Sequence, residues 1–422
     1  MSIQENSRQY FYSQICIALV WVTVIYSTVL QDKFITIQNG MLLLGGAVLI
    51  TLFLANCNEP MIIHDFMTNE SICMLLYMSY MLLIGFVFSN TIGTHIVQWI
   101  TCMEYLFLLI AISSLIIKTG SDTFHYLLLF EAIVLAVIFI RNPVYYGGGR
   151  YSISISKNPN ALGMSITTGI WVVLYLQQKK QMPLILCLTL IGIFGYCIML
   201  TGSRKSLVAA GIVITLWLLF CFIPSLNERG PLQSLFMLAI LIVIAIITWR
   251  TLQNVYYGSA IANRMNNLSY EVTEGDRSNM YRDGIALFKH NPLFGLGFQS
   301  FANYYGSYSH ATLVEIPVSG GIIGSLLYIA VYYISIRKTM RVINASKEKA
   351  DMVKEHAKAR MLLVLWVAML FYSTCIIHPY QFESFVIFGI IFGQTESIER
   401  QVNESPSEQL LKRNGSKYIK YV

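Results

Sequence analysis

The strongest constraint on this chain is the recurrence of apolar runs of about 18–25 residues, the length that a helix needs to cross a lipid bilayer. A soluble domain carries about 25% charged residues, whereas this chain is 12% charged and 55% apolar. The sequence therefore predicts an all-α polytopic membrane protein, a single integral membrane domain over residues 1–422 with about twelve transmembrane helices. The predicted spans are 10–30, 34–55, 71–90, 94–117, 122–140, 161–178, 183–200, 205–224, 231–249, 311–336, 361–378 and 380–395.

The distribution of Lys and Arg between the spans predicts their orientation, because cations are enriched on the cytoplasmic side. With the N-terminus inside, 18 of the 29 Lys and Arg residues fall on the inner side. This places both termini in the cytoplasm, with a basic cytoplasmic loop at about 337–360 and a cytoplasmic tail at about 396–422. The segments 141–160, 201–204 and 250–310 are then extracytoplasmic, and the last of these is one large loop that we expect to contain short amphipathic helices.

Several cations lie in these outer segments although the orientation rule disfavours them there. Arg150, Arg204, Arg277 and Arg282 are the arginines of interest, and each could simply pair with a lipid headgroup phosphate. Arg204 stands out because its turn, TGSRKS, is very short and joins two long apolar runs. Arg204 must therefore stay at the membrane surface.

The longest polar stretch, 275–324, begins with helical spacing. Arg277, Tyr281, Gly284 and Phe288 share one face, and Pro292 lies just beyond the point where the helix should stop. We expect an amphipathic helix on the outer leaflet with Arg277 on its tyrosine-bearing face.

Ionisable residues inside spans are costly and are commonly functional or paired. Glu104, Glu131 and Glu383 lie in predicted spans, where interhelical pairing is the favoured interpretation. Glu315 differs because it follows His310 by little more than one helical turn, near the outer end of its span.

Common catalytic and metal-binding patterns are missing. The sequence contains no DxD pair, HExxH, GxxxxGK[ST] or GxSxG motif, and its eight cysteines show no metal-binding spacing. The GLGF segment at 295–298 lacks the third glycine of a dinucleotide fingerprint, so we interpret it as a tight loop under a substrate. No basic stretch is interleaved with aromatics as on a nucleic-acid surface. We predict no metal and no cofactor, so an enzyme of this kind would take its donor from the membrane.

Four segments together resemble the O-antigen ligase and O-antigen or capsular polysaccharide polymerase superfamily, which are bacterial polytopic membrane glycosyltransferases using undecaprenyl-diphosphate-linked sugars. They are KNPNALG at 157–163, TGSRKSLVA at 201–209, the arginine–aromatic–PLFGLG region of RSNMYRDGIALFKHNPLFGLGFQSF, and HATLVEIPVSGGIIG at 310–324. The last is similar to the family's His-x(10)-Gly-x-x-Gly pattern, with Gly321 and Gly324 in place. The resemblance covers roughly 140–335. Ala311 departs from the amide or hydroxyl residue usual in the ligases, which favours a polymerase.

The resemblance implies roles for individual residues. Arg204 and Arg277, supported by Arg282 and Arg150, would bind the donor diphosphate, because a guanidinium stays charged and grips phosphate through two hydrogen bonds. His310 would orient or deprotonate the acceptor hydroxyl. Glu315 would orient it or act as a second candidate base.

The sequence thus predicts a polymerase that joins undecaprenyl-diphosphate-linked oligosaccharide repeat units into O-antigen, capsular or exopolysaccharide at the outer face of the bacterial cytoplasmic (inner) membrane. The alternative is a ligase that transfers finished glycan to a lipid core or a protein. A lipid-linked oligosaccharide flippase or other transporter is less favoured, because transporters usually place broken helices near the bilayer midplane. Expected partners are the lipid-linked donor and acceptor, membrane lipids, and flippase and chain-length regulator proteins, with no nucleic acid.

Overall fold

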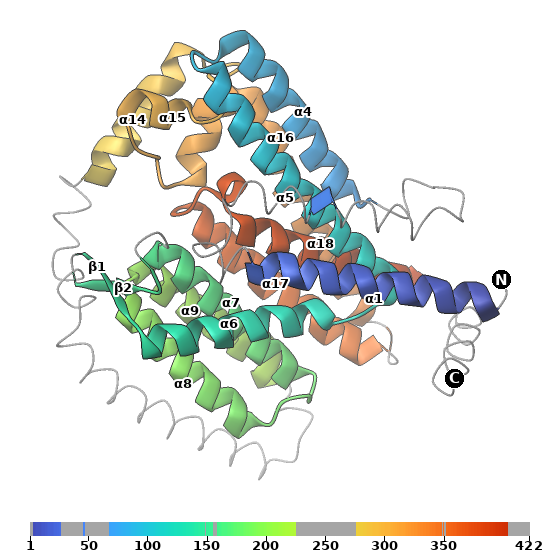
Figure 1. Cartoon of the computed structure of the whole chain (residues 1–422). Coiled ribbons are helices and arrows are strands. Elements are labelled where there is room, and N and C mark those ends of the chain that lie inside the picture. The colour runs from blue at the N-terminus through green and yellow to red at the C-terminus, as the bar shows by residue number, and fades with distance from the viewer. Residues whose placement is uncertain are drawn as a thin grey trace.

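The computed structural model describes residues 3–26, 45–46, 67–147, 149–154, 158–224, 276–347, 349 and 352–403, without the side chains of 3–10, 147, 276 and 277. This part of the chain is almost entirely helical (Figure 1). The elements are α1 (Ile3–Ile25), α4 (Asn69–Phe88), α5 (Ile92–Thr119), α6 (Thr123–Arg141), β1 (Val144–Gly147), β2 (Arg150–Ser152), α7 (Pro159–Gln178), α8 (Leu184–Thr201), α9 (Arg204–Trp217), the π-helical turn η2 (Leu218–Phe222), α14 (Asp276–His290), α15 (Ser300–Tyr305), α16 (Thr312–Lys347), α17 (Val353–Ser373), the 3₁₀ turn η4 (His378–Tyr380) and α18 (Phe382–Asn403).

Seven described helices are long and apolar enough to cross a membrane, judged by length and composition: α4, α5, α6, α7, α8, α9 with η2, and α16. The prediction of a mostly helical protein with several membrane spans is therefore confirmed, while the total of twelve stays a prediction. The predicted span 231–249, and 34–55 apart from 45–46, lie outside the described residues. The apolar part of α1, Phe11–Ile25, is shorter than the seven.

The predicted spans 361–378 and 380–395 fall on α17 and α18, which are not among the seven. Helix α18 is not among them because of its polar residues: Glu383, Gln394 and Glu396 lie along a helix that is buried over most of its length. A helix surrounded by protein need not be as apolar as one that faces lipid.

The packing of α18 against α5 is close because two glycines lie at the contact. A Cβ atom on Gly389 would lie 2.9 Å from the carbonyl oxygen of Leu109, and one on Gly393 would lie 2.8 Å from the Cα atom of Ser113. Glycines spaced by four residues on one helical face let two backbones approach each other. The backbones of α5 and α18 thus lie in close contact.

The two ends of the bundle differ in chemistry. At one end, which we call the Lys358 end, Lys179 and Lys358 both contact the carboxylate of Asp122, and the buried Lys338 pairs with Glu396. These contacts join the helix ends that the charge count assigns to the cytoplasm. Which compartment faces this end stays a prediction.

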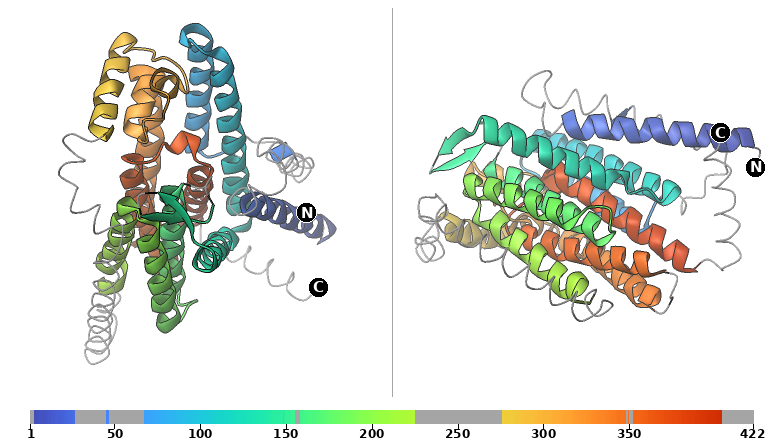
Figure 2. Two further views of the ribbon diagram at one scale, coloured as in Figure 1. Left: turned by 60° about the vertical axis from the view of Figure 1, so that its left-hand side comes forward. Right: turned by 90° about the horizontal axis from the view of Figure 1, so that it is seen from below.

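At the opposite end, the His310 end, lie the ribbon β1–β2 and the helices α14 and α15. Figure 1 shows α14 and α15 beside α16, and in Figure 2 the ribbon lies at one end of the neighbouring helices α7 and α8. The predicted helix at the start of 275–324 is confirmed as α14. One face of α14 packs on α16, because Gly284 faces Val314 and an added Cβ would lie 2.4 Å from that side chain. The position of α14 on the outer leaflet stays a prediction.

A break in α16 anchors the loop that follows α14. Gly321 adopts φ 62° and ψ −160°, which interrupts the helix. The backbone of the GLGF loop bonds to this break, with Leu296 N–H donating to Val318 O at 3.0 Å and Gly297 N–H to Ser319 O at 2.8 Å. Gly295 has φ 80°, and a Cβ there would lie 2.4 Å from Ser319 O. The tight loop is therefore held by α16, and its glycines allow the two backbones to approach each other closely enough for these hydrogen bonds.

Candidate active site at the His310 end

A cavity of about 240 Å³ opens at the His310 end where four parts of the chain meet. It is lined by Gln98 of α5, by Asn158, Asn160 and Ala161 at the start of α7, by Tyr308 and His310 before α16, and by Cys375, Ile376, Ile377, Tyr380 and Gln381 between α17 and α18. The lining combines amides, phenols and one imidazole.

The position of His310 follows from the residues on either side of it. Ser309 is buried and donates a hydrogen bond to Oε2 of Glu315 at 2.7 Å, while the backbone N–H of Thr312 donates to Ile376 O at 3.0 Å. Between these anchors His310 takes a left-handed conformation, φ 55°, and its side chain is exposed at the cavity. A non-glycine residue in this conformation is uncommon and is found at functional sites more often than elsewhere.

Glu315 lies behind the cavity wall. It is 1% exposed and accepts a hydrogen bond from the Tyr380 hydroxyl at 3.1 Å besides that from Ser309. Glu315 is not among the lining residues of the cavity. Of its two predicted roles, the geometry favours that of an orienting residue, because the carboxylate holds two neighbours of His310 in place.

The Pro-Asn segment and the Ser-Arg turn, two of the motifs singled out in the sequence, are in direct contact. Asn160 Oδ1 accepts hydrogen bonds from Arg150 Nη2 at 2.9 Å and from the Ser203 hydroxyl at 3.0 Å. Arg150 Nε also donates to Thr201 O at 3.3 Å. Arg150 is thus bound between α7 and the end of α8, beside the cavity that Asn160 lines.

Arg204 is the first residue of α9, directly after the capping residue Ser203, and is half-buried. Its neighbour Lys205 donates to Cys375 O at 3.1 Å, and Cys375 lines the cavity. The first turn of α9 therefore borders the cavity. A helix N-terminus with two cations favours a bound anion there.

The other two predicted arginines lie on α14. The side chain of Arg277 is outside the described part of the structure, and Arg282 is exposed. Tyr281, next to Arg282, donates to Thr374 O at 3.4 Å and ties α14 to the segment that carries Cys375. The backbone thus brings α14 towards the cavity, while Arg150, Arg204 and Arg282 are not among its lining residues.

Sequence reasoning missed Tyr308, Tyr380, Gln98 and Gln381 as lining residues. Tyr380 and Gln381 are the first two residues of the last predicted span, 380–395, and the polar sequence HPYQ where the last two predicted spans meet was the one available signal. Tyr380 accepts a hydrogen bond from the backbone N–H of Gln299 at 3.1 Å. Its hydroxyl therefore links the GLGF loop to Glu315.

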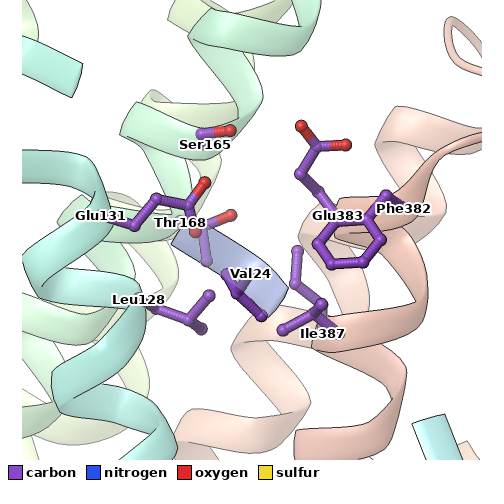
Figure 3. A pocket seen from close by; sticks show the side chains of 9 residues that line it. Val24, Leu128, Glu131, Ser165, Thr168, Phe382, Glu383 and Ile387 are labelled. Atoms are coloured by element: carbon purple, nitrogen blue, oxygen red, sulfur yellow. The ribbon is translucent and has the colours of Figure 1, made fainter. Parts of the chain in front are cut away.

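The intramembrane acids lie elsewhere. Glu131 of α6 and Glu383 of α18 line a second, small cavity of about 10 Å³ together with Ser165 and Thr168 of α7, and Figure 3 shows the two acids on opposite sides of it. Glu104 on α5 is half-buried. Their predicted interhelical pairing stays a prediction.

Part of the chain matches a known protein family. Residues 188–329 match the family model described as O-antigen ligase, and no curated protein matches the chain. The matched stretch runs from α8 into α16 and contains Arg204, Arg282 and His310. Together with the apolar helices, this confirms the resemblance seen in the motifs: the chain is a membrane protein whose residues 188–329 match an O-antigen ligase domain, and the match supports the O-antigen ligase and polymerase superfamily.

Proposed function

We propose that the protein is a polymerase that joins undecaprenyl-diphosphate-linked oligosaccharide repeat units at the outer face of the bacterial cytoplasmic membrane. The growing glycan would leave its carrier and join a hydroxyl of the next lipid-linked unit, giving O-antigen, capsular or exopolysaccharide. The observation that carries this proposal is the cavity in which His310 meets Asn160, at the border of the first turn of α9. Within the family, ligation of finished glycan to a lipid core or a protein is the second candidate, and Ala311 favours the polymerase.

The proposed reaction is one displacement at the anomeric carbon of the donor. The acceptor oxygen forms a bond to this carbon while the bond from the carbon to the diphosphate oxygen breaks. His310 takes the proton of the acceptor hydroxyl, and the bonding electrons leave with the diphosphate. A positioned general base contributes about 10²–10⁴ in rate, and an imidazole is the most common side chain in this role.

The leaving group is an anion, and the cations around the cavity suit its stabilisation. Arg204 at the start of α9 and Arg150 beside Asn160 are placed at its border, and Arg277 and Arg282 lie on the neighbouring α14. Fixed cations and a helix N-terminus could stabilise a diphosphate as it leaves. We therefore propose transfer without a metal or cofactor.

This reaction requires the His310 end to face outward, with the Lys358 end and both termini in the cytoplasm. Lipid-linked donor and acceptor would then enter from the outer leaflet, after a flippase has delivered them. Chain-length regulator proteins are further candidate partners.

The test is to delete the gene and identify the lipid-linked glycans that accumulate. Single repeat units on the carrier at the outer face are expected for a polymerase. Long chains that stay on the carrier would indicate a ligase instead. Repeat units trapped at the inner face would contradict both and indicate a flippase.

A further inference from the structure

The cavity beside His310 has an unusual lining. Among the described residues that line it there is no Asp, Glu, Lys or Arg. Four of the eleven are amides, namely Gln98, Asn158, Asn160 and Gln381, and two are tyrosines. The cations lie outside this lining, on the first turn of α9 and on β2. We call the space inside this described lining the neutral compartment, and the cations that bond to its lining residues from behind, Lys205 and Arg150, its cationic border.

We propose that this neutral compartment is the subsite for the acceptor sugar, and that it binds a single uncharged pyranose ring. The inference rests on the proposed function, since it names the substrate group that would face His310. Because His310 is part of the lining, a ring held in the compartment presents its hydroxyl to the imidazole. The diphosphate of the donor stays at the border with the arginines.

The size of the compartment limits its occupant. Pockets that hold drug-sized ligands measure roughly 300–1,000 Å³, whereas this cavity measures about 240 Å³. One sugar ring suits this volume, and an oligosaccharide would have to extend out of it. The subsite thus binds the reacting sugar alone.

Two tyrosines supply flat surfaces for the ring. The rings of Tyr308 and Tyr380 lie 5.9 Å apart between centroids at an angle of 64°, so they form a corner of the cavity. The apolar C–H face of a pyranose packs well on an aromatic ring, which combines a large apolar surface with a polar hydroxyl. Tyr380 is held by Glu315 and by the backbone of Gln299, so its ring is preorganised.

The amides are preorganised too. Arg150 and Ser203 both donate to Oδ1 of Asn160, so this side chain is held in place and its Nδ2 group is the part that can donate to a ligand. Gln98 Oε1 accepts from Gln299 Nε2 at 2.6 Å. Sugar hydroxyls both donate and accept hydrogen bonds, which matches amides and phenols. A uronic acid would bring a carboxylate into a compartment whose described lining carries no cation, and burying an unpaired charge is costly.

The test measures direct binding to the purified full chain in nanodiscs by saturation-transfer difference NMR. The probes are methyl hexopyranosides and the matching methyl hexopyranosiduronates. Wild type should bind at least one neutral glycoside and prefer it over its uronate by at least about tenfold. Tyr308→Ala should weaken neutral binding by about tenfold, because it removes one wall of the corner. Tyr308 is 40% exposed, so the truncation should leave the fold intact.

The matched control is Tyr333→Ala, which removes a 60% exposed tyrosine on α16 outside the cavity and should leave binding unchanged. The inference is overturned if wild type binds no neutral glycoside, if uronates bind equally well, or if Tyr308→Ala binds like Tyr333→Ala.

The same preparations are assayed for transfer from a lipid-diphosphate-linked glycan. Wild type without transfer would contradict the proposed function alone, because binding is measured separately. In active enzyme, Tyr308→Ala should raise the KM of the acceptor; a rise in the KM of the donor instead would place the donor sugar in the cavity and refute the assignment.

Discussion

The hydroxyl of Tyr380 offers the sharpest test of how the cavity wall is held. It donates to Oε1 of the buried Glu315 at 3.1 Å and accepts from the backbone N–H of Gln299 at 3.1 Å. The substitution Tyr380→Phe removes both bonds while keeping the ring. Leaving a buried polar group without its partner costs about 1–3 kcal/mol. Because Ser309 still donates to Glu315, we expect the substitution to lower the free energy of unfolding by an amount within that range.

A double-mutant cycle with Glu315→Gln assigns the loss to this pair. Residues that share a hydrogen bond show coupling energies of about 0.5–3 kcal/mol, whereas independent sites are additive. Unfolding of purified protein is followed in mixed micelles with increasing dodecyl sulfate, and the transfer rate is measured on the same samples. The control is Tyr333→Phe, whose exposed hydroxyl interacts with Arg337 at 3.4 Å and should change stability by less than about 0.5 kcal/mol. Additive effects in the cycle, or a Tyr380→Phe variant as stable as Tyr333→Phe, would refute the reasoning.

The remaining predictions concern the membrane topology, the general base His310, the diphosphate-binding residue Arg204 and the loop that contains Gly295. Single cysteines are placed at Lys289 and Lys354 and treated with an impermeant thiol reagent on intact cells. The cysteine at 289 should react and the one at 354 should not; the reverse pattern would overturn the orientation. His310→Ala should bind lipid-linked donor normally in a pull-down but lose about 10²–10⁴ in transfer, and full transfer would make the histidine structural. Arg204→Lys should be impaired nearly as much as Arg204→Ala, because lysine cannot form the two parallel hydrogen bonds to phosphate that arginine forms. Loss of this contact should weaken donor binding by about 2–5 kcal/mol. Normal polymer length and yield in Arg204→Ala would show that Arg204 does not bind the donor diphosphate. Gly295→Ala should lower both stability and transfer, since a Cβ there would lie 2.4 Å from a carbonyl oxygen, and a wild-type unfolding curve would contradict this.

The sequence could predict which segments belong together because each motif sits at a helix end. The Pro-Asn segment, the Ser-Arg turn and the His310 segment lie between predicted spans that alternate in direction, so they gather at one end of the bundle. Contact between Asn160 and Ser203 follows that arrangement. The clustering follows from the alternating directions of the predicted spans on either side of each motif.

The lining residues could not be predicted, because they depend on rotation and packing of helices. Gln98 lies six residues into α5, where a single amide in an apolar run gives no sign of the direction it faces. Tyr380 is positioned by the short turn η4 and by bonds to residues 65 and 81 positions away in the chain. Likewise the sequence shows Glu383 as an acid inside the predicted span 380–395, and the burial of α18 against α5 becomes visible only in three dimensions.

The glycines of the GLGF loop and Gly321 of α16 determine the position of His310 without contacting the cavity. Gly295 and Gly297 let the loop after α14 bond to α16 at Ser319, and Gly321 provides the break that exposes those carbonyls. The polypeptide between these docking points carries α15, Tyr308 and His310, so both of its ends are anchored on one helix. Anchoring both ends reduces the conformations open to the loop, which lowers the entropy lost when a substrate is positioned. A substitution at Gly295 should therefore impair transfer through the placement of His310, even though the glycine is not among the lining residues of the cavity.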